Sequence, residues 1–228
     1  MSQKQKINVS KNEKGILRLF WTIQQTKELP RQGIILAGFK LNMVDTVAAH
    51  SFAVSILSYL LARELRKLYK RLDPLKVLEM AVFHDIGEAL TGDVGRYIKW
   101  DAKEAWDKVE ETAIEKLERE VNFKDNKNES WLQNLVISYN KRLFPYAWIV
   151  KVADSLDAAA QTNTEHTLKK TAGKTRNDRK LIYDLENVAK SYEEKGDLEE
   201  ANFLRHLCNF FKVACKLIRE GNIDRIYL

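Results

Sequence analysis

Apolar residues recur three and four positions apart along most of the 228-residue chain, and this helical periodicity limits the possible folds more than any other feature. Only three prolines and nine glycines are available to interrupt it. β-Branched residues are scattered, and no stretch keeps the apolar–polar alternation of a half-buried strand. No internal repeat is visible. The pattern predicts an all-α protein of about eight helices without a sheet.

Eight segments carry the helical pattern, and two kinds of start signal help to place them. The expected helices span residues 15–29, 46–69, 72–90, 101–121, 129–143, 145–170, 178–195 and 197–220. Asp73 followed by Pro74 gives the clearest start, because an Asp side chain accepts from free N–H groups and Pro fits a first helical position. Asp45 or Thr46 can cap the second helix. The stretch 30–43 carries two glycines and is expected to be a connector or a short extended piece.

The composition fits one folded domain. The chain is 45% hydrophobic and 31% charged, which argues against disorder. We predict a single helical domain over residues 1–228, with its core motifs in 16–160 and the helices of 161–228 packed on them. The formal net charge of +6 could attract phosphate-bearing partners, although most charges alternate in sign along helix faces. Residues 169–180 are strongly basic, lack bulky apolar side chains and are expected to form an exposed loop.

The two cysteines and the absence of long apolar runs indicate a cytoplasmic protein. Cys208 and Cys215 lie seven residues apart in one helical pattern, about 10 Å along the axis, which is too far for a disulfide within that helix. They are expected to be free, as is usual in a reducing compartment. No apolar run reaches membrane-spanning length, and the polar first residues do not resemble a signal peptide. We therefore expect no membrane partner.

The stretch AVFHDIGEALTGDV, residues 81–94, places four ionisable side chains at the end of an apolar helix. Burying such groups is costly, so their presence needs a physical reason. In a continuous helix Glu88 would lie one turn from both His84 and Asp85, so that one helix end presents all three to a common point. Asp93 closes the run.

Two more ionisable residues lie inside apolar helical patterns, His50 in TVAAHSFAVSIL and Asp154 in AWIVKVADSLDAAA. Either residue alone is more often a hydrogen-bonded core residue than a ligand. Together with His84 and Asp85 they form a set of two imidazoles and two carboxylates that a divalent transition metal would neutralise. Four such ligands leave positions for water, which is typical of a catalytic site. A closed structural zinc site would favour cysteines, and neither cysteine is near these motifs.

The ordered set H…HD…D resembles the HD-domain superfamily of metal-dependent phosphohydrolases. HDIGEALTGDV is similar to the HD–x–x–E–x–x–x–GD segment of the 5′-deoxynucleotidase subfamily, which acts on nucleoside 5′-monophosphates. LPRQG, VDTVAAHSF and VKVADSLDA resemble other blocks of that group. The resemblance covers about residues 16–160 and implies a single-domain HD-type helical bundle that is usually a homodimer.

The resemblance also implies a site and a reaction. The implied metal ligands are His50, His84, Asp85 and Asp154. Glu88 would hold or deprotonate the attacking water, and Asp93 would complete the acid–base arrangement near the leaving 5′ oxygen. The implied cofactor is one divalent transition metal, with cobalt, manganese, iron, nickel and zinc all compatible with the ligand set. The implied substrate is a deoxynucleoside 5′-monophosphate, from which phosphate is removed.

Carboxylates alone would repel a phosphate dianion, so a cationic side chain is needed for substrate binding. Arg31 is our candidate, because a guanidinium can bind two phosphate oxygens at once. It could equally be an ordinary surface arginine. Lys151 is a weaker candidate. Ala49 and Ile34 stand where the subfamily often has an acidic and an aromatic residue, which leaves sugar and base preference open.

Other functions remain open from the sequence. An HD-type phosphodiesterase or pyrophosphohydrolase would share the same metal ligands. The positive charge and the basic loop 169–180 also suggest a nucleic-acid-binding helical protein, but no helix-turn-helix or interleaved aromatic–basic pattern supports specific nucleic-acid binding. A third alternative is an inactive helical scaffold that has kept the motif. The presence of Glu88 and Asp93 argues against it, because a scaffold would need neither residue.

Overall fold

The computed structural model describes residues 10–121, 130–162 and 176–220, and all regular structure in these ranges is helical. The predicted all-α class is therefore confirmed. The helices of ten or more residues are α1 (Lys11–Ile23), α3 (Val47–Leu65), α4 (Pro74–Phe83), α7 (Lys103–Val121), α8 (Trp131–Asn140), α9 (Ala147–Thr162), α10 (Arg176–Glu194) and α11 (Leu198–Arg219). Shorter elements are α2 (Gln32–Leu36), α5 (Glu88–Thr91), α6 (Arg96–Asp101) and the 3₁₀ turns η1 (Gln24–Lys27) and η2 (Leu41–Met43).

Helix starts follow local capping chemistry. The Thr46 hydroxyl accepts from the Ala49 N–H at 3.2 Å and begins α3, which decides between the two predicted caps. The Asp73 carboxylate accepts from the Leu75 N–H at 3.0 Å with Pro74 at the first helical position, as predicted.

Two predicted segments differ from the structure: one expected helix is interrupted, and the expected connector contains short helical turns. The helix expected over residues 72–90 ends at Phe83, residues 84–87 form a turn, and α5 begins at Glu88. The expected connector 30–43 contains α2 and η2. Periodicity alone misses the break after Phe83 because the apolar spacing continues across it.

Part of the predicted basic loop 169–180 lies outside the described residues. Residues 163–175 are among those not described, whereas the last residues of 169–180 are helical because α10 begins at Arg176. Cys208 and Cys215 are free and buried, as predicted.

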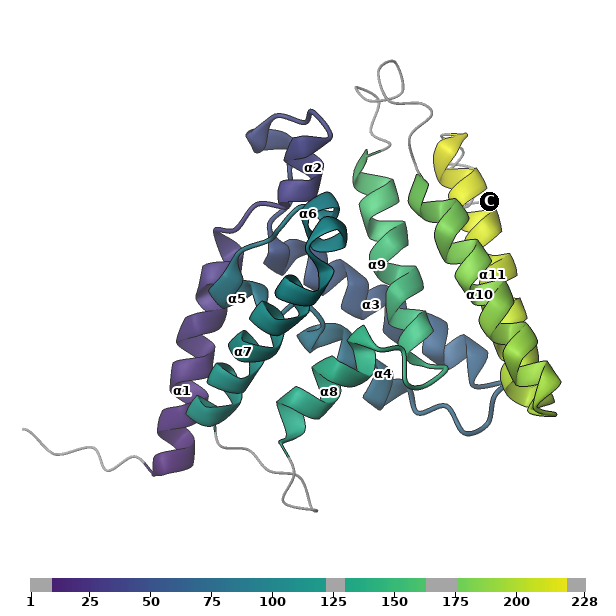
Figure 1. Ribbon diagram of the computed structural model, residues 1–228, viewed down its shortest axis with the longest axis horizontal. Coiled ribbons are helices and arrows are strands. Elements are labelled where there is room, and N and C mark those ends of the chain that lie inside the picture. Colours follow the sequence, from purple (N-terminus) through teal and green to yellow (C-terminus); the bar gives the residue numbers. More distant parts are fainter. Residues whose placement is uncertain (1–9, 122–129, 163–175, 221–228) are drawn as a thin grey trace, which may run out of the picture.

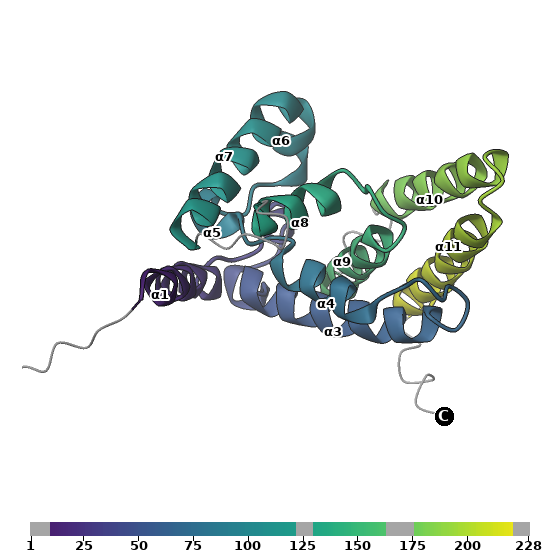
Figure 2. The same cartoon turned by 90° about the horizontal axis from the view of Figure 1, so that it is seen from below.

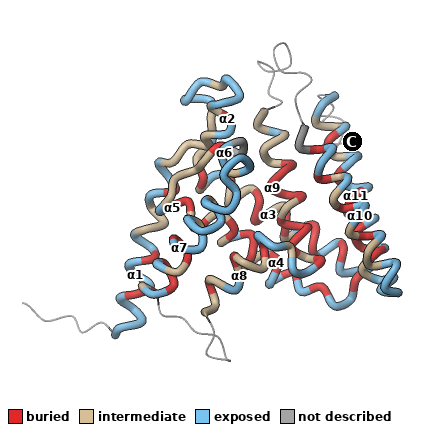
Figure 3. The backbone as a smooth tube through the Cα atoms, viewed as in Figure 1, coloured by how far each residue is buried: buried red, intermediate tan, exposed pale blue. Residues whose placement is uncertain are grey.

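The buried apolar side chains form two clusters. The larger joins α3, α4, α9, α10 and α11, with Phe203 and Phe211 of α11 among its fully buried members. The smaller joins α1, α7 and α8. Figure 3 shows the buried residues concentrated on the inner faces of these helices. Ala81 belongs to the larger cluster and Ile86 to the smaller, so the turn at residues 84–87 lies where the chain passes from one to the other.

The helices are arranged with α1 at one end of the molecule and the α10–α11 pair at the other (Figure 1). In Figure 2, α3 runs along one edge, while α6 and α7 lie away from it. Because α10 and α11 share their core with α3, α4 and α9, the packing supports the single-domain organisation, which stays a proposal. Among the described helices, none is both long and apolar enough to cross a membrane.

Candidate active site

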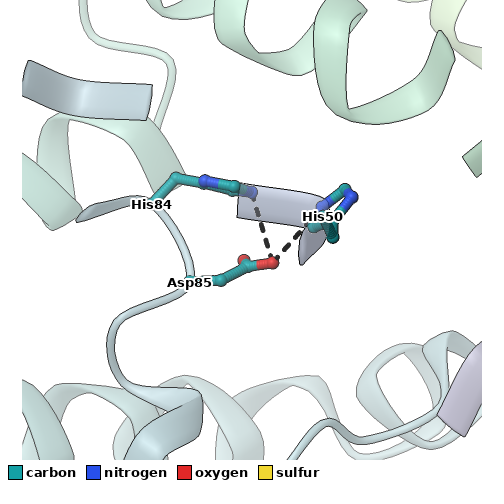
Figure 4. Close-up of side chains that lie close together, drawn as sticks. All are labelled: His50, His84 and Asp85. Atoms are coloured by element: carbon teal, nitrogen blue, oxygen red, sulfur yellow. Dashed lines mark ion pairs between the residues drawn. The ribbon is translucent and has the colours of Figure 1, made fainter. Parts of the chain in front are cut away.

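Four of the residues selected from the sequence converge at the passage between the two clusters. His50 comes from the first turns of α3, His84 ends α4, Asp85 follows it, and Asp154 lies in α9. His50 Nε2 is 3.6 Å from Asp85 Oδ2 and 3.5 Å from Asp154 Oδ1, and His84 Nε2 is 3.2 Å from Asp85 Oδ2. Figure 4 shows both rings directed toward the Asp85 carboxylate. Ligand atoms of His50, His84 and Asp85 all lie within 4.8 Å of one another.

The other ring nitrogens of the two histidines are already engaged. His84 Nδ1 lies 2.8 Å from the Ala81 carbonyl oxygen, which can only accept, so this nitrogen carries the proton. His50 Nδ1 lies 2.6 Å from Asp157 Oδ2, and a carboxylate favours the same tautomer. Both Nε2 atoms are buried without a hydrogen-bond partner among the described residues. Two such lone pairs beside carboxylate oxygens fit a divalent cation.

The charges of the cluster act strongly on each other. Burial acts to lower the pKa of His50, but the neighbouring Asp154 and Asp157 carboxylates outweigh burial and raise the pKa to about 9. Burial acts to raise the pKa of the Asp85 carboxyl, but the charges of His84 and His50 outweigh it and lower that pKa. Without a metal, a proton on His50 therefore takes the place of the cation that the carboxylates attract.

Asp154 is held by neighbours on one of its oxygens. Lys151 Nζ lies 2.6 Å from Oδ2, and the buried Tyr139 hydroxyl donates to the same oxygen at 3.4 Å. Burial acts to raise the pKa of Asp154, but the Lys151 charge and the neighbouring His50 ring lower it well below its usual range. The other oxygen, Oδ1, is the one that faces His50. Lys151 thus orients a carboxylate of the cluster.

Glu88 stands beside the cluster at the start of α5 and is buried. Lys99 Nζ donates to its Oε1 at 3.1 Å, whereas Oε2 is buried with no hydrogen-bond partner among the described residues. Burial and the charge of Asp85 raise the pKa of Glu88 well above its ordinary value, and Lys99 opposes them. The free oxygen is therefore basic and shielded from bulk water.

Asp93 and Arg31 face each other across two loops. Gly92 has φ 75°, a conformation that favours glycine, and it turns the chain from α5 to Asp93. Arg31 Nε lies 3.7 Å from Asp93 Oδ2. Burial acts to lower the pKa of Arg31, but the charges of Asp85 and Asp154 raise it, so the guanidinium stays a cation directed toward the acidic cluster.

A family model described as 5′-deoxynucleotidase YfbR-like matches residues 23–194, which is most of the chain. The chain belongs to this family. The resemblance drawn from the HD and GD motifs is thereby confirmed, and it places this YfbR-like protein among HD-type hydrolases.

Solved structures share the fold of this YfbR-like protein. A crystal structure of a protein from Pyrococcus horikoshii matches with a TM-score of 0.60 and 26% identity over 87% of this chain and 99% of that one. A conserved hypothetical protein from Pyrococcus furiosus matches with a TM-score of 0.58 and 25% identity over 86% and 98% of the two chains. A search of curated proteins found no match.

Three residues at the site of this YfbR-like protein were not predicted from the sequence. Asp157 could have been found, because it lies three residues after Asp154 and so shares its helix face. Tyr139 and Lys99 carry no local signal, since their contacts depend on how α8 and α6 pack. Ile34, where the family often has an aromatic side chain, is buried.

Proposed function

We propose that this YfbR-like protein removes phosphate from deoxynucleoside 5′-monophosphates with a divalent metal held by His50, His84, Asp85 and Asp154. The observation that carries the proposal is the pair of buried, unpartnered Nε2 atoms beside two carboxylates. A buried polar atom without a partner is costly, and a cation at their common point would satisfy both nitrogens. Family membership supports the reaction class.

The metal supplies one part of the chemistry: when bound, it polarises the phosphate and makes a water more acidic. Arg31 supplies another, because its guanidinium can bind phosphate oxygens that the carboxylates would otherwise repel. The Arg31–Asp93 distance of 3.7 Å is longer than a hydrogen bond, so the guanidinium keeps donors for a substrate.

In this proposal Glu88 and Asp93 carry out the proton transfers of the reaction. The water oxygen forms a bond to phosphorus while the bond from phosphorus to the 5′ oxygen breaks. Glu88 Oε2, which is buried and unpartnered, accepts the proton that the water loses. On the other side, Asp93 gives a proton to the 5′ oxygen as the nucleoside leaves, and so completes the acid–base arrangement. The products are a nucleoside and inorganic phosphate.

The test is phosphate release from a panel of ribo- and deoxyribonucleoside 5′-monophosphates, with a cyclic dinucleotide as a further substrate. The chelator-stripped protein is assayed with manganese, cobalt, zinc or magnesium added back. We expect metal-dependent release from the deoxynucleoside monophosphates. The proposal would be contradicted if protein that retains metal by elemental analysis released no phosphate from any monophosphate. Cleavage of the dinucleotide would then favour a diester substrate.

We also propose a homodimer formed through the outward face of α3. Phe52, Ile56 and Leu60 are exposed at four-residue spacing, and no charged residue occurs between Ser51 and Ala62. Two copies with antiparallel α3 helices would pair Phe52 with Leu60, and Ile56 with Ile56 of the second copy. The same three side chains of each copy would then form both sides of a two-fold interface. A face without charges is also where two copies of charge +6 repel least.

Light scattering after gel filtration tests the dimer. We expect the mass of two chains for the unmodified protein and of one chain for Phe52→Lys, with Phe210→Lys on α11 as an exposed aromatic control that stays dimeric. A monomeric wild-type protein would overturn this proposal without affecting the proposed reaction. The cytoplasmic location stays a prediction from the sequence.

A further inference from the structure

Lys99 of α6 occupies a cradle made by three side chains. Its Nζ lies 3.1 Å from Glu88 Oε1 and 3.6 Å from Glu110 Oε1, and it stands 5.2 Å from the centroid of the Trp106 ring. The side chain is 26% exposed, so these contacts replace most of its water. Cations bind both carboxylates and aromatic faces, and here one ammonium group does both.

The cradle is itself fixed by a hydrogen bond within α7 and by a contact from one further helix, α8. Trp106 Nε1 donates to Glu110 Oε1 at 2.7 Å, and Asn140 Nδ2 of α8 lies 3.4 Å from Glu110 Oε2. Lys99 therefore links α5, α6 and α7 at one point, and α8 supports that point through Asn140. A lysine held in this way has little freedom to leave Glu88.

The contact with Lys99 distinguishes the two oxygens of Glu88. Oε1 accepts from Lys99, while Oε2 is buried and unpartnered among the described residues. A carboxylate held on one oxygen cannot rotate freely, so the second oxygen has a defined direction. Burial and the charges of Asp85 and Asp93 raise the pKa of Glu88, and the charge of Lys99 opposes them.

We propose that Lys99 is a positioning residue that holds Glu88 Oε1 and so presents Oε2 to the attacking water. This inference rests on the proposed function, in which Glu88 accepts the proton of that water. Lys99 also lowers the pKa of Glu88, against the effects of burial and of the Asp85 and Asp93 charges. A substrate-binding role would instead require the phosphate to separate Lys99 from both Glu88 and Glu110.

The experiment compares Lys99→Met and Lys99→Arg with Lys103→Met, each loaded with manganese and assayed on the best monophosphate of the panel. Lys103 is the matched control, because it is an exposed lysine paired only with Asp107 among the described residues. We expect kcat to fall about 30-fold or more in Lys99→Met, in keeping with the contribution of a positioned base. We expect KM and metal content to stay within about 3-fold of the wild-type values, since in this proposal Lys99 binds neither the substrate nor the metal.

Two readouts separate positioning from simple structural support. Loss of the Lys99 charge raises the pKa of Glu88, so the acidic limb of the kcat–pH profile moves to higher pH in Lys99→Met. Lys99→Arg keeps the charge and is expected to recover most of kcat. Lys103→Met should match the wild type in kcat, KM and pH profile.

The outcomes are distinct. A raised KM with unchanged kcat would overturn positioning in favour of substrate binding, and an unchanged kcat would overturn it outright. An inactive wild type would remove the proposed function and this inference with it. If Lys99→Met does not fold, Glu110→Gln loosens the same lysine from its second anchor and is expected to lower kcat. An unchanged kcat in Glu110→Gln would then overturn the inference.

Discussion

Two of the regions that bury ionisable side chains, the α10–α11 pair and the candidate active site, differ in how their charges are satisfied. At the α10–α11 pair, Asp178 is 4% exposed and accepts from Arg219 at 3.1 Å, beside Cys215. Burial and the charge of Asp178 raise the pKa of the Cys215 thiol to about 12, so the thiol stays protonated and unreactive. The partners of this cluster all come from the same two helices.

At the candidate active site, several buried polar atoms of ionisable side chains lack hydrogen-bond partners among the described residues. His50 Nε2, His84 Nε2 and Glu88 Oε2 are buried without a hydrogen bond among the described residues, although their neighbouring atoms are fully engaged. The difference fits a first region that stabilises the helix pair and a second region that, in the function proposed above, is completed by a cation, water and substrate. The following predictions test this difference.

The largest effect is expected from removing a proposed metal ligand. Asp85→Ala and His50→Ala should lose the metal and lower kcat/KM about 1,000-fold or more, which corresponds to several kcal/mol of electrostatic stabilisation. Elemental analysis after gel filtration and phosphate release measure the two effects. Normal phosphate release by metal-free Asp85→Ala would show that the cluster is not a metal centre.

Glu88→Gln is expected to separate metal binding from turnover. The amide keeps the shape of the side chain and an oxygen for Lys99, but it cannot accept a proton from water. We expect full metal content and a kcat lowered about 100- to 10,000-fold, the range of general-base catalysis. Loss of metal together with activity would instead make Glu88 part of the metal site.

Asp157→Asn tests the orientation of His50. Its carboxylate lies 2.6 Å from His50 Nδ1 and favours the tautomer with a free Nε2. We expect metal affinity to fall about 10- to 100-fold, as is usual for partners of metal-bound histidines. Competition with a chromogenic chelator measures the dissociation constant without an activity assay. Unchanged affinity would remove Asp157 from the site.

The smallest functional effect is expected at the α10–α11 pair. Asp178→Ala removes the acceptor of Arg219, and we expect the free energy of unfolding to fall by about 1–3 kcal/mol. Metal affinity and kcat of the folded variant should not change. Urea denaturation and the phosphate assay measure the two quantities, and an altered kcat would contradict the division of roles between the two regions.

Most of the fold could be predicted because it depends on local chemistry. The predicted long segments correspond to the eight helices of ten or more residues, and capping at Thr46 and Asp73 follows from neighbouring residues. The break after Phe83 could not be predicted, because its cause is the passage of the chain from one hydrophobic cluster to the other.

The sequence by itself determined the helices, the family and the residue types from which a metal site could be built. Only the tertiary structure decided that His50, Asp154 and Asp157 meet His84 and Asp85, and that Lys99 reaches Glu88. Periodicity reports which face of a helix is apolar, but it does not say which helices pack together. Contacts between residues far apart in sequence depend on the packing of whole helices, and that packing fixes which buried polar atoms remain without a partner.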